Sequence, residues 1–240
     1  MTRSLKLPPS RYFPPAESAE IGGLVAIGGK LTPDWLLDAY RHGIFPWPMS
    51  DFDDPMFWFS PDPRGIIEFE RFHISRRLAQ TLRSGKFQVT CDRDFAGVIW
   101  GCATAGSRKA NTWLTPRMIE AYLRMHRLGY AHSVEAWHQG RLAGGTYGVA
   151  IAGLFAAESM FYQVSDASKV ALAHLVAHLR ARGYRLLDIQ QVTPHTARMG
   201  AIEIPRSEYL ARLAEALAAD VTFGDRLESD PVCLLPGRGI

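Results

Sequence analysis

The sequence predicts an α+β protein in which helices pack on a mostly antiparallel sheet. Hydrophobic residues make up 47% of the 240 residues, which is enough to bury a substantial core. From residue 115 to residue 190 the pattern runs helix, three strands, helix, strand. Turns at Gln139-Gly140 and at Gly153 join the three strands as hairpins, so these strands are expected to be antiparallel neighbours.

The composition argues against several classes of protein. The N-terminal stretch MTRSLKLPPSRYFPP has no apolar leader, and no uninterrupted apolar run approaches membrane-spanning length. Cys91, Cys102 and Cys233 form no CxxC pair. His174 and His178 are four positions apart, as are the two histidines of the zinc protease motif H-E-x-x-H. That motif requires Glu directly after the first His, and this chain has Leu175 there. We expect a cytoplasmic protein with reduced thiols, no metal site and no membrane association.

Residues 1–30 read as irregular chain with one short strand at Leu24–Ile27. A helix follows, with Thr32 as its N-cap and Pro33 at its first position, and ends at Gly43. Two segments rich in proline and aromatic residues come next, at 43–48 and 57–64. Their rings either form a small aromatic core or offer a platform on which bases stack, and the sequence leaves both interpretations open.

A basic helix is expected at Ser75–Leu82 and a strand at Phe87–Cys91. Residues 71–109 hold eight Lys/Arg against two Asp, a charge of +6 that leaves −3 for the rest of the chain. This basic segment is either a solvated face or a surface for a phosphate backbone. If it binds nucleic acid, the candidate contacts on and beside the helix are Arg76, Arg77, Arg83 and Lys86.

The second half of the chain alternates strands and helices. A helix beginning at Thr115-Pro116 places Tyr122 on its buried side and ends at Gly129, and a strand follows at Ala131–Trp137. Two hairpin strands are expected next, at 145–152 and 154–161, followed by a helix with an apolar stripe at 165–183. A strand at 184–190 and a last helix at 207–219 complete the pattern.

Three polar residues stand out on the predicted strands. Period-2 alternation places Asp188 and Gln190 together on one strand face, where Asp188 can orient the side-chain amide of Gln190 and the pair can bind an amine. An ordinary polar sheet face is the alternative. Glu158 lies within an apolar strand and therefore needs a cation or a ligand ammonium as partner. No Ser or Cys has the setting of a covalent nucleophile, which favours direct transfer between two positioned substrates.

Many short blocks, taken in order, resemble the bacterial leucyl/phenylalanyl-tRNA-protein transferases over nearly the whole chain. The most specific are Gly43–Trp47, Ser60–Arg64, Glu158–Phe161, Ala167–Lys169, Leu187-Asp188 with Gln190, and Gly200–Arg206. The resemblance implies a small N-terminal domain at 1–63 and a GNAT-like acyltransferase domain at 64–240. It further implies transfer of Leu or Phe, and less readily Met, from aminoacyl-tRNA to proteins with N-terminal Arg or Lys, feeding N-end rule degradation without metal or cofactor.

The resemblance also assigns roles to residues. Asp188 and Gln190 would be the catalytic pair, and Glu158 would meet the amino group of the tRNA-borne amino acid. Trp47 and Trp113 would hold the terminal adenosine. The family more often has a larger apolar residue at the position of Thr146. The remaining substrate-binding residues would be Tyr122 and an apolar side-chain pocket of Thr146, Phe155, Leu175, Leu179 and Leu187.

Two other functions compete with this one. An acetyltransferase using acetyl-CoA needs a glycine-rich loop before the helix, and residues 161–166 contain no glycine. A noncatalytic RNA-binding module would use the basic segment and the aromatic residues, but it leaves Glu158 and the Asp188/Gln190 pair unexplained. We expect a monomeric enzyme whose partners are aminoacyl-tRNA and protein.

Overall fold

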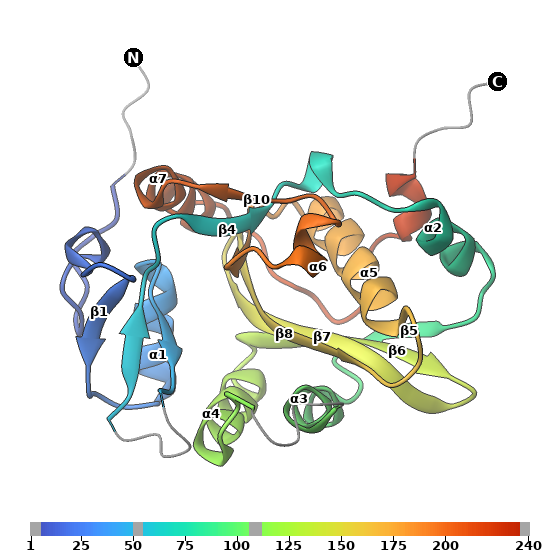
Figure 1. Cartoon of the computed structure of the whole chain (residues 1–240), viewed down its shortest axis with the longest axis horizontal. Helices are drawn as coiled ribbons and strands as arrows, with labels where there is room; N and C mark the ends of the chain where they lie inside the picture. The colour runs from blue at the N-terminus through green and yellow to red at the C-terminus, as the bar shows by residue number, and fades with distance from the viewer. Residues whose placement is uncertain (1–5, 50–54, 106–111, 236–240) are drawn as a thin grey trace.

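The computed structural model describes residues 6–49, 55–105 and 112–235, and its two β-sheets are flanked by helices (Figure 1). A three-stranded sheet belongs to the N-terminal part of the chain, and a seven-stranded sheet forms the centre of the molecule. All strand pairs but one are antiparallel among the described residues. The α+β class and the mostly antiparallel sheet expected from the sequence are confirmed.

The small sheet has the order β1-β3-β2, with bounds Leu24–Ile27, Phe57–Phe59 and Phe45–Trp47. Helix α1, Pro33–Arg41, lies beside it (Figure 1). Most of the aromatic rings in this region form a core: Trp58 is fully buried and its ring lies 4.8 Å from that of Phe13. Trp47, at the end of β2, remains 40% exposed and is therefore free to meet a ligand.

The large sheet has the strand order β10-β4-β9-β8-β7-β6-β5. The helix that follows β8 carries the chain back to the other end of the sheet, so β9 pairs with β8 in parallel. The strands are β4 Arg64–Ile67, β5 Gln88–Cys91, β6 Ala131–His138, β7 Arg141–Ile151, β8 Leu154–Tyr162, β9 Leu186–Gln190 and β10 Ala201–Ile204.

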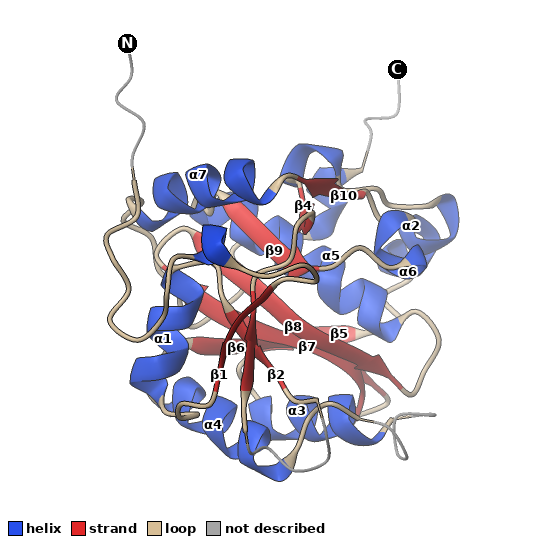
Figure 2. Ribbon diagram, turned by 60° about the vertical axis from the view of Figure 1, so that its left-hand side comes forward, coloured by secondary structure: helices blue, strands red, loops and turns tan. Residues whose placement is uncertain are grey.

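Helices cover both faces of the central strands (Figures 1 and 2). Helices α3 and α4 lie on one face and α5 on the other, while α7 lies over the end of the sheet that carries β10. No described helix has the length and apolar character needed to cross a membrane. The helices are α2 Arg76–Arg83, α3 Phe95–Thr104, α4 Pro116–Arg127, α5 Ala167–Arg182, α6 Pro194–Ala197 and α7 Arg206–Leu217.

Two hydrophobic clusters fill the space between these layers. One joins the N-terminal sheet and α1 to α3, α4, α7 and one face of the large sheet, and the other lies between the opposite face, α5 and α2. Because the first cluster includes both Trp58 of the small sheet and Tyr147 of the large one, the N-terminal segment packs into the body of the molecule.

Helices α3 and α5 approach the central strands closely because a glycine lies at each contact, on β7 against α5 and on α3 against β8. A Cβ on Gly144 of β7 would lie 2.7 Å from Cβ of Ala167 at the start of α5. On the other face, a Cβ on Gly101 of α3 would lie 2.4 Å from the ring of Phe161 on β8. Real Cβ atoms do not approach this closely, so both glycines set the spacing of the layers around β8.

Six of the described helices and strands were not expected from the sequence, namely α3, α6, β2, β3, β4 and β10. Helix α3 is buried on several sides, so it lacks the single apolar stripe by which an amphipathic helix is recognised. Strands β4 and β10 are four residues each and pair with each other, which residue patterns over so short a length do not reveal.

Candidate functional site

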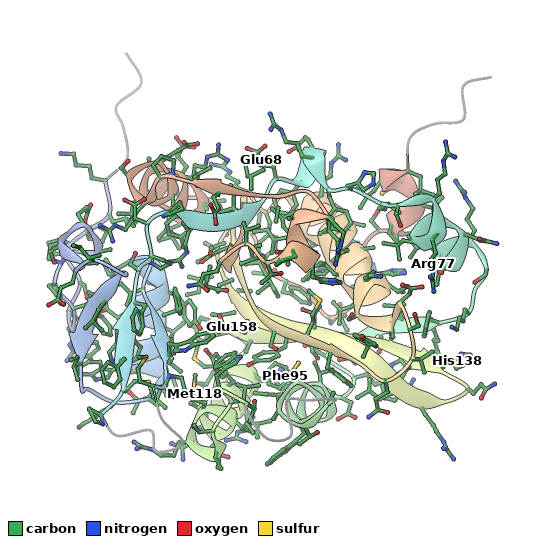
Figure 3. The ribbon with its side chains drawn as sticks, in the orientation of Figure 1. Glu68, Arg77, Phe95, Met118, His138 and Glu158 are labelled. Carbon is green, nitrogen blue, oxygen red and sulfur yellow. The ribbon has the colours of Figure 1, made fainter. Side chains whose placement is uncertain are left out.

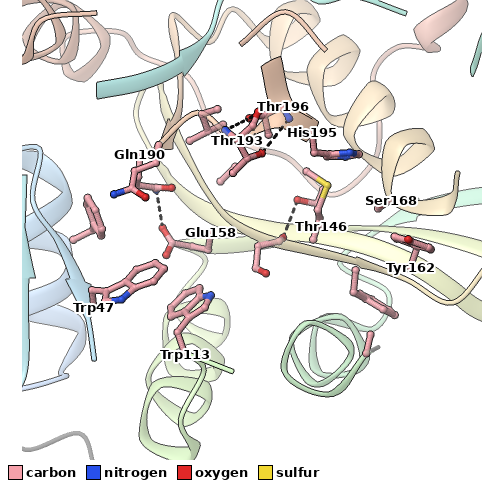
Figure 4. Close-up of a pocket in the computed structure, with 18 residues that line it drawn as sticks. Trp47, Trp113, Thr146, Glu158, Tyr162, Ser168, Gln190, Thr193, His195 and Thr196 are labelled. Carbon is pink, nitrogen blue, oxygen red and sulfur yellow. Dashed lines mark hydrogen bonds between the residues drawn. The ribbon is translucent and has the colours of Figure 1, made fainter. Parts of the chain in front are cut away.

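A pocket of about 650 Å³ opens where β8 and β9 separate (Figure 4). The parallel pairing joins Leu154–Ala156 to Leu186–Asp188 and is not continued beyond these residues. Residues that follow on each strand, Glu158 on β8 and Gln190 on β9, therefore project into the opening instead of continuing the ladder. The N-terminal sheet closes one side of the pocket through Phe45 and Trp47.

The pocket wall changes in character from one end to the other (Figure 4). Trp47 and Trp113 form a stacked pair at one end, with ring centroids 5.2 Å apart and planes inclined by 14°. Glu158 lies beside this pair, and Thr146 lies further along. The opposite end carries the polar side chains of Ser168, Thr193, His195 and Thr196 together with Tyr162.

Glu158 is the acid of the pocket and has an unusual environment. Its Oε2 accepts a 2.8 Å hydrogen bond from the Tyr122 hydroxyl, which lies 2.7 Å from the hydroxyl of Tyr40. Burial raises the pKa of Glu158 to about 7, against hydrogen bonds from Tyr40 and Tyr122 that lower it. Glu158 is therefore close to half-protonated at neutral pH, although one edge of its side chain reaches the pocket.

The raised pKa of Glu158 predicts a pH-dependent effect on stability. Between the ordinary pKa of 4.5 and the folded value of about 7 the folded state binds the extra proton, so stability falls as pH rises through this window. We expect Glu158→Gln to raise the free energy of unfolding at pH 8 by about 1–2 kcal/mol, allowing for the exposed edge, and to leave it unchanged at pH 4.

Urea unfolding of both proteins at the two pH values measures this effect. Glu215→Gln is the matched control, because Glu215 is an exposed acid on α7. If Glu158→Gln and the parent protein have equal free energies of unfolding at pH 8, the conclusion that burial makes ionisation of Glu158 unfavourable is wrong.

Asp188 does not line the pocket. Its side chain is fully buried and holds Arg64 through two hydrogen bonds, Nε to Oδ1 at 2.9 Å and Nη2 to Oδ2 at 2.7 Å. The Tyr209 hydroxyl donates to Oδ2 at 2.9 Å, and the backbone N–H of Gln190 donates to Oδ1 at 2.9 Å. Asp188 thus contacts the backbone of Gln190, and the expected bond to its side-chain amide is not formed.

A bulge explains why Asp188 and Gln190 differ. In the pairing of β4 with β9, Ile66 faces Asp188 and Gly65 faces Gln190, so Ile189 is an extra residue. Gln190 also has a positive φ of 59°. The regular alternation on which the sequence prediction relied therefore ends at Asp188, and the bulge directs the Gln190 side chain to the pocket beside Glu158 (Figure 4).

The apolar residues expected to form the substrate pocket are divided. Thr146 lines the pocket and donates to the Ser159 carbonyl at 3.1 Å. The other four pack in the hydrophobic cluster between the sheet and α5, away from the pocket wall: Phe155, Leu175, Leu179 and Leu187. Apolar surface in the pocket comes instead from Phe45, Ala105, Met160, Phe161 and Ile189.

The basic residues on and just after α2 lie on the surface, outside the pocket. Arg76, Arg77, Arg83 and Lys86 are all exposed, and Arg77 projects at the periphery in Figure 3 while Glu158 lies deep in the molecule. Arg77 reaches Asp166 at 3.4 Å, and Asp166 also pairs with Lys169 at the start of α5. This pair places α2 next to the Ser168 end of the pocket. Arg108 and Lys109 of the basic segment lie outside the described residues.

Besides several residues of the pocket wall, sequence reasoning missed the roles of four polar residues in and behind the site. Arg64 and Tyr209 surround Asp188, and Tyr40 supports Tyr122. His195 lines the pocket; burial lowers its pKa, and nearby Lys169 and Arg198 lower it further, so the ring is neutral at pH 7. Arg64 left one signal, because an arginine that precedes the apolar run Gly65–Ile67 must find a buried partner.

The described residues contain no group of three or more His, Cys, Asp or Glu side chains arranged to hold a metal ion. The groups gathered at the pocket are instead an acid, an amide, stacked aromatic rings and backbone carbonyls. Such a set can bind an ammonium group, an apolar side chain and a flat base, and it can hold two reactants against each other.

Comparisons with known proteins agree with these features. Residues 66–214 match the family model described as leucyl/phenylalanyl-tRNA protein transferase, and residues 29–62 match the model of that family's N-terminal domain. Proteins named leucyl/phenylalanyl-tRNA–protein transferase are similar to it over most of the chain.

The relative from Anaeromyxobacter sp. (strain Fw109-5) is 51% identical over 92% of this chain and 97% of its own length. The relative from Azoarcus sp. (strain BH72) is 53% identical over 84% and 86%, respectively. The relative from Syntrophotalea carbinolica is 50% identical over 85% and 88%. The chain therefore belongs to the leucyl/phenylalanyl-tRNA protein transferase family.

Proposed function

We propose that this aminoacyltransferase moves Leu or Phe, and less readily Met, from aminoacyl-tRNA to proteins whose N-terminal residue is Arg or Lys. The product is a new peptide bond, and the modified protein enters N-end rule degradation. The observation that carries the proposal is the joint placement of Glu158, Gln190 and the stacked Trp47/Trp113 pair around one pocket. Family membership supports the aminoacyl-tRNA donor.

The donor fits the pocket in one direction. The terminal adenosine stacks against the exposed Trp47 beside Trp113, and the α-amino group of the aminoacyl ester meets Glu158. Its side chain then lies against the apolar wall near Thr146 and Met160. An apolar pocket separates side chains that differ by one methylene by about 1–3 kcal/mol, so partial acceptance of several apolar amino acids is expected.

The reaction needs no covalent enzyme intermediate. The acceptor's unprotonated α-amino nitrogen attacks the ester carbonyl, a C–N bond forms, and the C–O bond to the ribose breaks. The proton lost by the attacking nitrogen is balanced by the proton gained by the ribose hydroxyl. An aminoacyl ester is already activated, so orientation of the two substrates supplies much of the acceleration.

Gln190 is the proposed orienting group for the acceptor amine, because its side chain lines the pocket next to Glu158. A neutral amide is too weak a base to remove the proton by itself. Asp188 is a positioning residue in this account. It fixes the backbone N–H of Gln190 at 2.9 Å while it is itself held by Arg64 and Tyr209.

The direct test is transfer of labelled Leu, Phe and Met from their tRNAs to a peptide that begins with Arg, with an N-acetylated copy of the peptide as control. Transfer to the free peptide alone is the expected result, with Val as a poorer donor. Binding of tRNA without transfer from any donor would contradict the proposal and favour an RNA-binding module. The assay needs no added metal or cofactor.

Salt dependence tests the role of α2. If its exposed charges meet tRNA phosphates, Arg76→Gln combined with Arg83→Gln should raise the KM for aminoacyl-tRNA about 10-fold near 100 mM salt, with kcat unchanged. The slope of log affinity against log salt should fall by about 2, because two phosphate contacts are lost. Initial rates across a salt series measure both quantities.

Arg180→Gln is the matched control for the α2 variant, because Arg180 is an exposed arginine near the C-terminal end of α5. It should change neither KM nor the salt slope. An equal change for the α2 variant and the control would contradict a local phosphate contact at α2.

A further inference from the structure

The side-chain amide of Gln190 lies among three acceptor oxygens. One end of the amide is 3.4 Å from Glu158 Oε1, which is the contact drawn in Figure 4. A 180° rotation of the amide about its last side-chain bond turns the nitrogen to the other side, where it donates to the carbonyls of Ala157 at 3.0 Å and Ile189 at 2.9 Å. The rotated amide makes two hydrogen bonds of normal length in place of one long contact.

If Glu158 is ionised, the Gln190 amide cannot form favourable hydrogen bonds with all three of these oxygens. An amide has one NH₂ end and one oxygen, so with three acceptors around it one oxygen must face another oxygen. With the nitrogen on the two carbonyls, the oxygen of Gln190 faces Glu158 Oε1. A hydrogen between these two oxygens removes the conflict, and Glu158 is the group that can carry it.

The second oxygen of Glu158 identifies which atom carries the proton. Oε2 accepts from the Tyr122 hydroxyl at 2.8 Å, and the Tyr40 hydroxyl lies 2.7 Å from that of Tyr122 and also stabilises the ionised form of Glu158. Because Oε2 already accepts a hydrogen bond, the proton of a neutral Glu158 belongs on Oε1, toward Gln190. Every polar group of the cluster then has a partner.

We propose that in the free enzyme a proton on Glu158 Oε1 occupies the position that the α-ammonium group of the donor takes when it binds. Donor binding then displaces this proton. The α-ammonium of the aminoacyl group enters between Glu158 Oε1 and one lone pair of the Gln190 oxygen, whose second lone pair is left for the acceptor amine, and the Glu158 proton leaves to water. No bond between heavy atoms forms or breaks in this step. The inference rests on the proposed function and deepens it by coupling donor recognition to a proton.

The surroundings of Glu158 support a proton that is readily exchanged. The groups that act on its charge come from four elements: Tyr40 on α1, Tyr122 on α4, Arg64 on β4 and Asp188 on β9. Burial raises the pKa to about 7, and the tyrosine hydrogen bonds prevent it from rising further. The acid is therefore neutral below this pH in the free enzyme, and a cation placed against Oε1 is sufficient to ionise it.

The exchange gives a physical basis for requiring a free α-amino group. A deacylated tRNA brings no cation to the two oxygens, and an N-acetylated aminoacyl group brings an amide that cannot replace the lost charge. Below pH 7, kcat/KM for the donor should fall by about tenfold per pH unit, because one proton must leave Glu158 as the donor binds.

Carbon-13 NMR of the full chain labelled at the Glu side-chain carboxyl carbon tests the proposal directly. The Glu158 signal is assigned by its loss in Glu158→Gln. In the free enzyme it should titrate with a midpoint near pH 7, so that at pH 6 about ten carboxyls are protonated for each ionised one. A carboxyl that is already ionised at pH 5.5 would overturn the proposal.

The exchange itself is measured at pH 6 with a non-transferable donor end, adenosine carrying phenylalanine through a 3′-amide. Binding should move the Glu158 signal to its ionised position and release about one proton per molecule in weakly buffered solution. The N-acetylated copy should do neither. A carboxyl that stays protonated with the free amine bound would show that no exchange occurs.

The Tyr122→Phe variant tests whether the Tyr122 hydroxyl controls the protonation of Glu158 or only supports the fold. Loss of the hydroxyl that donates to Oε2 should raise the midpoint of the Glu158 titration, and the acid limb of kcat/KM should move with it. An unchanged midpoint in the folded variant would contradict the arrangement. If neither analogue binds to the parent enzyme, the donor placement of the proposed function fails and the exchange with it, whereas the free-enzyme titration still decides the protonation state.

Discussion

Replacing Asp188 with Asn is expected to lower the free energy of unfolding by about 3–5 kcal/mol, the largest effect on stability that we expect from any single substitution here. Arg64 and Asp188 have side chains that are each 1% exposed, and they are joined by two hydrogen bonds. The substitution removes the carboxylate charge and leaves a buried guanidinium without its counter-ion. Urea unfolding at pH 7 measures the loss.

Two further variants separate the charge from the hydrogen bonds. Tyr209→Phe removes one donor to Asp188 and should cost about 1 kcal/mol. Arg64→Met combined with Asp188→Leu removes both charges and should be more stable than Asp188→Asn alone, because no unpaired ion remains in the interior. An Asp188→Asn protein within about 1 kcal/mol of the parent would show that the pair is not what holds this region together.

This result bears on how activity data for Asp188 are interpreted. A loss of turnover in Asp188→Asn has two sources, partial unfolding and displacement of Gln190, whose backbone N–H is held by Asp188. Turnover should therefore be compared under conditions in which circular dichroism shows both proteins to be fully folded. A remaining defect in kcat under those conditions is the contribution of positioning.

Replacing Gln190 with Ala is expected to lower kcat for peptide-bond formation by about 100-fold, the cost typical of misplacing a reactant by about 1 Å. The side chain of Gln190 reaches the pocket from the bulge in β9 and lies next to Glu158. The backbone hydrogen bond from residue 190 to Asp188 does not depend on the side chain, so stability should change little.

Single-turnover rates with saturating Phe-tRNA and an Arg-initiated peptide measure the effect of Gln190→Ala on chemistry. Gln88→Ala on the exposed edge strand β5 is the control and should leave the rate unchanged. A variant with normal kcat and a raised KM for the peptide would reassign Gln190 to acceptor binding alone.

Local sequence signals predicted most of the secondary structure. A helix was expected to begin at Thr115-Pro116, and in the structure it does, with the Thr115 hydroxyl accepting from the backbone N–H of Met118. Gly183 was expected to end the helix that follows β8, and it adopts the left-handed conformation that favours glycine, with φ at 85°. These features depend on residues a few positions apart, which is why the sequence reveals them.

The candidate site was predicted in part. Gln190, Glu158, Trp47, Trp113 and Thr146 do come together around one pocket. Asp188 lies behind the pocket because a bulge interrupts the strand between it and Gln190. The four apolar residues expected in the pocket face the core, because both faces of a central strand and several sides of α5 are buried alike. Hydrophobicity alone does not distinguish a core wall from a pocket wall.

By itself the sequence determined the α+β class, the hairpins, the strongly capped helices and the presence of an acid and an amide that an ordinary strand does not need. The tertiary structure alone decided what those two groups can do. Asp188 meets its cation 124 positions away in the sequence, and Glu158 receives its hydrogen bond from Tyr122 on a separate helix. The chemistry of the site depends on which charges and oxygens the packing brings within 3 to 4 Å, since electrostatic and hydrogen-bond energies fall steeply with distance.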